Sequence, residues 1–187
     1  MKITLAAWLL VMVHAPEGYP TGTFEVYRSA TPPLSVSFEY PAGWQAEESS
    51  GSTERYRQVQ LYAPPELEPR LRIYIVVRAV PAKDLGGKYG GVAEMATAYQ
   101  NQALPSLTVE EHPPVMVLGS PATVLGVNGT MALPWQSSTP KAVPVSGARV
   151  FFEKDGTLYE AAWLATPEQA PAVQTAFTHL LDTLTVQ

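Results

Sequence analysis

Residues 34–44 read Leu34-Ser35-Val36-Ser37-Phe38-Glu39-Tyr40-Pro41-Ala42-Gly43-Trp44, which predicts an amphipathic β-strand followed by a turn. Apolar side chains at every second position would share one face of the strand, and the Ser and Glu side chains would take the other. Pro41 has no N–H group and would end the strand, and Gly43 permits a sharp bend. Trp44 could then fold back onto the sheet. We therefore expect Phe38 and Trp44 in the core.

The rest of the chain predicts more strands, with one helix among them and one at the end. Alternation or short apolar runs favour strands over residues 23–29, 55–63, 71–80, 107–111, 115–118, 122–127, 148–153 and 157–165. Asp155-Gly156 is a strong hairpin signal between the last two strands. Residues 47–53 are polar and predict a turn, and residues 128–147 predict a long excursion. Because strands and helices do not alternate regularly, we expect an α+β architecture with an antiparallel sheet.

Two segments carry apolar residues at helical spacing. Within residues 90–104, the expected stripe is Val92, Met95, Ala96, Tyr99 and Ala103. The closing helix is expected to start at Thr166-Pro167-Glu168-Gln169, with Thr166 as its cap. Its buried stripe would be Val173, Phe177, Leu180, Leu181 and Leu184. That arrangement would leave His179 and Asp182 facing solvent.

The composition favours a single acidic globular domain. The chain has 187 residues, of which 46% are hydrophobic and 16% charged, and this suits one core of ordinary size. Its 12 Lys and Arg residues and 17 Asp and Glu residues give a net charge of -5, which argues against a nucleic-acid partner. The chain has no cysteine, so disulfides and thiolate chemistry are excluded. No sequence motif indicates a cofactor.

Residues 1–15 have the layout of a short secretory signal peptide. Lys2 precedes an apolar run from Ile3 to Val13, and Val13 and Ala15 occupy the small-residue positions before a cleavage site. The run is too short to span a bilayer, so we expect no membrane span in the mature chain. We expect a linker over 16–22 and one domain over 23–187, secreted or periplasmic. If residues 1–15 are retained, they would instead form a buried first helix or strand of a cytoplasmic protein.

Three short segments follow one another along the chain: residues 36–44, Leu118-Gly119-Ser120-Pro121-Ala122 and Asp155-Gly156-Thr157-Leu158-Tyr159. They resemble the PsbP-like family, which is named for the extrinsic subunit of photosystem II, and the similarity extends over residues 23–186. The family shares its fold with a Ran-binding nuclear-import factor. The resemblance implies a three-layer α/β/α sandwich around a mostly antiparallel sheet, with binding or assembly activity and no shared catalytic residue. No residues here match a photosystem or Ran interface, so neither role is carried over.

Two surfaces are candidates for binding a protein or a small-molecule ligand. Arg72, Tyr74 and Arg78 are expected to share a sheet face with Tyr56, Gln58, Gln60 and Tyr62 of the neighbouring strand. Arg and Tyr favour interfaces, and a basic strip on an acidic protein would attract an acidic partner, although an ordinary solvated face is the alternative. Trp135, in the 128–147 excursion, is a candidate interface anchor. The alternative is a strand continuation with Trp135 over the core.

His112 allows two alternatives to a binding function. A hydrolase would need a serine and a carboxylate beside His112 in a pocket. Glu110 and His112 would point to the same side of a strand, and with a third ligand they would suit a metal-binding carrier. A solvated strand end before Pro113-Pro114 explains both residues as well. We therefore expect a non-enzymatic binding or assembly-accessory domain with no catalytic or metal-ligating residue.

Overall fold

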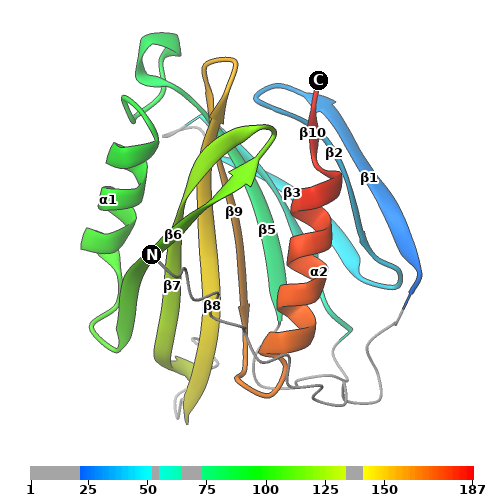
Figure 1. Ribbon diagram of the computed structural model, residues 1–187, viewed down its shortest axis with the longest axis vertical. Helices are drawn as coiled ribbons and strands as arrows, with labels where there is room; N and C mark the ends of the chain where they lie inside the picture. Colours follow the sequence, from blue (N-terminus) through cyan, green and yellow to red (C-terminus); the bar gives the residue numbers. More distant parts are fainter. Residues whose placement is uncertain (1–21, 52–54, 65–72, 134–140) are drawn as a thin grey trace, which may run out of the picture.

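A computed structural model describes residues 22–51, 55–64, 73–133 and 141–187 (Figure 1). Within these ranges the architecture is α+β and mostly antiparallel, as the sequence predicted. The strands divide into two sheets, which the sequence did not predict. No helix in the described part of the chain is long and apolar enough to cross a membrane.

The larger sheet has seven strands in the order β3-β4-β5-β9-β8-β7-β6, and neighbouring strands pair antiparallel. Their bounds are β3 Gln45–Gly51, β4 Tyr56–Tyr62, β5 Tyr74–Pro81, β6 Leu107–Val117, β7 Ser120–Leu133, β8 Lys141–Lys154 and β9 Thr157–Ala165. The smaller sheet has the order β1-β2-β10, with β1 Phe24–Thr31, β2 Leu34–Pro41 and β10 Thr185–Val186.

The two helices lie on opposite faces of the seven-stranded sheet. α1 (Val92–Gln102) packs on β7 and β8, and α2 (Ala170–Thr183) packs on β2, β8 and β9. Successive residues of a strand point to opposite faces of the sheet. Phe151 therefore packs in the apolar cluster under α1, whereas Phe152 packs in the main core under α2. The smaller sheet shares the α2 face through contacts of β2 with β4 and β5. In Figure 1, α2 crosses in front of the sheet and α1 lies beside β6 and β7. A short 3-10 helix, Lys83–Leu85, precedes α1.

The opening strand of the sequence argument is β2, and its register is confirmed. Leu34 and Val36 are fully buried, Phe38 is 1% exposed and Trp44 is 3% exposed. Gly43 has a φ of 82°, the conformation that the predicted bend requires. On α2, Phe177 and Leu180 are buried, whereas Leu181 is partly buried at the edge of the core.

Two hairpins turn through a pair of residues with positive φ. Asp155-Gly156 joins β8 to β9, with Lys154 paired to Thr157, as predicted. Leu118-Gly119 joins β6 to β7 in the same way. Between His112 and Val115 the β6–β7 register shifts, because Pro113 and Pro114 cannot donate to the ladder. Beyond this bulge the hairpin crosses over the sheet toward α2 (Figure 1), and Val117 and Ala122 enter the main core.

Several predicted boundaries are wrong. Most of the predicted turn at 47–53 belongs to β3, which is held by its ladder with β4 because its side chains are mostly exposed and polar. Most of the 128–147 excursion is hairpin, since β7 continues to Leu133, paired with Lys141 of β8. The helix cap is Gln169 instead of Thr166, whose carbonyl oxygen accepts the N–H groups of Gln169 and Ala170.

Candidate binding surfaces

The predicted strand face is present on the side of the sheet that carries α1. Tyr74 and Arg78 lie on β5, and the β4–β5 register places Tyr62 opposite Tyr74 and Gln58 opposite Arg78. Arg78 Nε donates to Gln58 Oε1 at 3.2 Å. Arg72 and Trp135, the other two predicted binding residues, lie outside the described residues. Whether this face binds a partner stays a prediction.

Glu160 of β9 organises this face. Its side chain is 6% exposed and forms an ion pair with Arg149 Nη1 of β8, and its second carboxylate oxygen lies 3.8 Å from Arg78 Nη1. A buried carboxylate needs such partners, because removing its charge from water is costly. The side chains of Arg78 and Arg149 are 28% and 22% exposed, so both are partly accessible to solvent. Both guanidinium groups therefore interact with the same Glu160 carboxylate.

Each guanidinium group lies over a tyrosine ring. Arg78 Cζ is 4.2 Å from the centroid of the Tyr56 ring, and Arg149 Cζ is 3.9 Å from that of Tyr99 on α1. Stacking fixes the planar groups and leaves their edges to donate hydrogen bonds. Burial raises the pKa of the Tyr74 phenol, and the nearby Arg149 partly opposes the shift. Tyr74 is therefore a neutral hydroxyl at ordinary pH. We call Tyr56, Tyr74, Arg78, Tyr99, Arg149 and Glu160 the arginine–tyrosine face.

Sequence reasoning missed Arg149, Glu160 and Tyr99 as members of this face. A signal for two of them was present, because Glu160 is a lone charge in the apolar strand Leu158–Ala165 and must find a cation. If residues are paired outward from the Asp155-Gly156 turn, Phe151 lies opposite Glu160. Arg149, two residues before Phe151 on β8, then lies on the same face of the sheet as Glu160. Tyr99 depends on how α1 docks, which no local pattern specifies.

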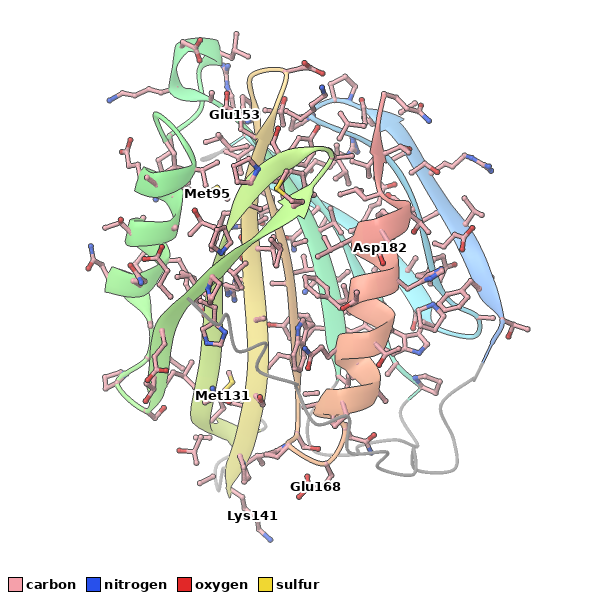
Figure 2. The ribbon with its side chains drawn as sticks, viewed as in Figure 1. Met95, Met131, Lys141, Glu153, Glu168 and Asp182 are labelled. Atoms are coloured by element: carbon pink, nitrogen blue, oxygen red, sulfur yellow. The ribbon has the colours of Figure 1, made fainter. Side chains whose placement is uncertain are left out.

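The other face of the sheet holds a cavity of about 590 Å³ between α2 and strands β6 to β9. Gly126 and Ala148, which are cross-strand partners, form part of its floor, and Trp163 of β9 borders it. An adjoining space of about 200 Å³ continues along α2 as far as Asp182. Figure 2 labels Asp182 on this helix. The two spaces share lining residues: Val115, Val124, Ala148, Trp163 and Gln174. We call them together the α2 groove.

His112 lies at the β6 wall of the α2 groove. A Cβ atom built on Gly126 would come within 2.5 Å of His112 Nε2, so the imidazole lies directly over that glycine. Ser146 also lines the groove, but its hydroxyl donates to Asn128 Oδ1 at 3.0 Å. None of the described residues that line the 590 Å³ cavity is Asp or Glu. The carboxylate that the hydrolase alternative requires is thus not among them.

The metal-carrier alternative lacks a third ligand among the described residues. Glu110 and His112 lie on the same strand, but no group of three His, Cys, Asp or Glu side chains within the described ranges could hold a metal ion. His179, which we expected to face solvent, instead contacts β1 and β2. Its Nε2 atom lies 2.8 Å from Glu39 Oε2, and its ring stacks on Phe24 with centroids 3.8 Å apart. Asp182 is exposed, as predicted.

The fold has counterparts among solved structures. PsbP from the cyanobacterium Synechocystis matches with a TM-score of 0.51 and 11% identity, over 98% of this chain and 99% of that one. The fold is PsbP-like. A Pseudomonas aeruginosa protein of unknown function shares this PsbP-like fold, with a TM-score of 0.50 and 16% identity over 89% of this chain and 99% of that one. LpqN of Mycobacterium tuberculosis, involved in cell envelope biogenesis, matches with a TM-score of 0.49 and 11% identity over 88% and 91% of the two chains.

No protein-family model matches the sequence, and no curated protein matches it. The structural match, and no sequence match, confirms the PsbP-like fold that the sequence resemblance implied. At 11% and 16% identity these likenesses concern the fold, and the link to a Ran-binding factor stays an expectation.

Proposed function

We propose that residues 23–187 form an exported, non-enzymatic binding or assembly-accessory domain that holds an acidic segment of another protein. The contact surface is the arginine–tyrosine face. The observation that carries the proposal is the clustering of Arg78 and Arg149 around the buried carboxylate of Glu160, on a chain whose net charge is -5. Two arginine side chains clustered on an acidic chain attract carboxylates on a partner.

The chemistry of the face suits recognition better than simple solubility. Arginine and tyrosine are enriched where protein interfaces gain most of their binding energy. Stacking on Tyr56 and Tyr99 holds the two guanidinium groups before a partner arrives, so less side-chain entropy is lost on binding. Glu160 fixes them further by ion pairing. We include Arg72 and Trp135 as additional contacts on the grounds of the sequence.

The role of Arg78 can be tested with the mature full-length chain on an array of acidic, neutral and basic peptides of equal length. We expect acidic peptides to bind best and their affinity to fall as salt rises. Arg78→Gln should weaken that binding about tenfold, because it removes one of the two charges. Arg149 still pairs with Glu160 in this variant, so the fold is retained. Arg28→Gln, an exposed arginine of β1 on the other sheet, is the matched control.

Two results would contradict the proposed surface. One is a preference for basic peptides. The other is equal loss of binding in Arg78→Gln and Arg28→Gln, which would reflect overall charge instead of a site. Export has its own test, the intact mass of the protein recovered from its native host. A soluble cytoplasmic species that retains residues 2–15 would contradict export and leave the binding surface untouched.

A further inference from the structure

We propose that the α2 groove is a binding site for a small single-chain amphiphile, with an apolar body and an anionic head group. The site lies on the face of the sheet opposite the arginine–tyrosine face, because Trp163 borders the groove whereas Glu160 and Ala162 of the same strand belong to the other face. The inference therefore does not rest on the proposed protein partner.

The groove exists because small residues occupy its floor. Gly126 of β7 and Ala148 of β8 face each other across the ladder, and neither fills the space beneath α2. The neighbouring Trp163 is a cross-strand partner of Ala148 and forms one side. The cavity volume of about 590 Å³ lies in the range of small-molecule sites. α2 borders the groove from Ala170 to Asp182, which is about 18 Å at 1.5 Å per residue.

The part of the groove along α2 suits an alkyl chain. It is lined by Val115 and Met116 from the β6–β7 hairpin and by Phe177 and Leu181 from the helix. Met116 is 68% exposed and Val115 is 40% exposed, so this apolar surface faces water in the absence of a ligand. An apolar chain would cover it, and the flexible Met116 side chain could adapt to its shape.

The other part of the groove suits the head group. The His112 imidazole lies over Gly126, and in the described residues it has no hydrogen-bond partner. Asn128 adds an amide group at the same end, and Gln174 lines both parts of the groove. No Asp or Glu is among the described residues that line this cavity, so a carboxylate can approach the imidazole, whereas Asp182 disfavours it at the far end. The His112 imidazole at one end and the Asp182 carboxylate at the other thus define which way the ligand lies.

An extended peptide fits this groove less well than an alkyl chain. A peptide would have to satisfy its own N–H and C=O groups, and the nearest edge strand is β6. At the groove that strand is interrupted by Pro113 and Pro114, which offer no N–H group. An alkyl chain has no backbone polar groups to satisfy.

Titration calorimetry of the full chain with decanoate, decyltrimethylammonium and a decyl glycoside tests the proposal, each below its micelle concentration. We expect one decanoate per chain, with the cationic amphiphile bound at least tenfold more weakly. Gln174→Trp, which places a large ring in the groove from an exposed helix position, should weaken decanoate binding at least tenfold. Ala148→Leu should do the same from the floor. Ala93→Leu on the exposed side of α1 is the matched control and should bind as the wild type does.

His112→Gln isolates the head-group contact. It should reduce the preference for decanoate over the neutral glycoside and leave glycoside binding unchanged. Failure of all three amphiphiles to bind, equal binding of all three head groups, or unchanged decanoate affinity in Gln174→Trp would each overturn the proposal. Arg78→Gln should not alter decanoate binding, so the outcome for this groove and the outcome for the proposed protein-binding face are distinguishable.

Discussion

Glu160 is the residue on which the charge arrangement of the α1 face depends. It is the only charged residue of β9, and its carboxylate is nearly removed from solvent. Arg149 and Arg78 make this placement tolerable by ion pairing. The two arginines are less buried, so the three charges do not contribute equally to stability.

This asymmetry predicts unequal costs for two substitutions. Arg149→Leu leaves the buried Glu160 carboxylate with Arg78 alone and should lower the free energy of unfolding by about 3 kcal/mol. Glu160→Leu leaves two arginines that can turn toward water and should cost less than half as much. Urea unfolding of both variants measures the difference. A larger loss in Glu160→Leu would show that the carboxylate is not the costly partner.

At the level of elements, the β8–β9 turn has residues that favour its backbone conformation, whereas the β6–β7 turn contains a residue that does not. Asp155 and Gly156 have φ values of 51° and 74°, which both residue types adopt readily. Leu118 has a φ of 51° as well, although leucine rarely adopts positive φ. There the side chain packs against the main core, so tertiary contacts hold a turn that the local sequence would not choose.

The β8–β9 turn is open to direct test. Gly156→Ala places a Cβ at positive φ and within 3.0 Å of Leu85 Cδ1, so we expect a loss of about 1 kcal/mol in the free energy of unfolding. Asp155→Asn keeps a residue suited to this turn and should stay within about 0.5 kcal/mol of the wild type. Thermal unfolding of the Gly156→Ala and Asp155→Asn variants measures both changes in stability. Equal stability of the two variants would contradict this account of the turn.

These elements also show why sequence reasoning succeeded in part. β2, the Asp155-Gly156 hairpin and the stripe of α2 were predictable because each carries a local period or turn signal. β3 carries none, since an edge strand with exposed side chains is held by backbone pairing. The α2 groove was not predictable, because the sequence does not show that Gly126 and Ala148 are cross-strand partners beneath α2. The partition into two sheets likewise depends on contacts between distant segments.

At the scale of the whole molecule, buried tyrosines link stability to pH. Burial is the main cause that raises the pKa values of Tyr27, Tyr40, Tyr74 and Tyr159 above their usual range. Hydrogen bonds to Glu48 and Glu25 add to the shifts at Tyr27 and Tyr40. The folded protein therefore keeps phenolic protons that the unfolded chain releases near pH 10.

The sign of the effect follows from these proton numbers. Above about pH 10 the unfolded state binds fewer protons than the folded state, so the free energy of unfolding falls as pH rises. Below that pH the stabilisation is fully present. Urea unfolding measured between about pH 8 and pH 11 gives the free energy of unfolding, and phenolate absorbance reports ionisation of the tyrosines. The free energy of unfolding should begin to fall at a lower pH than that at which these tyrosines ionise in the folded protein. Stability that stays constant across this range would contradict the burial of these side chains.

The interrupted ladder of β6 has a further consequence for behaviour in concentrated solution. A sheet edge with a continuous row of N–H and C=O groups is a template on which other chains can assemble into fibres. At one edge of the seven-stranded sheet, Pro113 and Pro114 remove two donors and bend the strand. At the other edge, β3 presents Glu47, Glu48 and serines, whose charge and polarity disfavour stacking. Pro113, which also lines the groove, and Pro114 therefore protect the protein against aggregation.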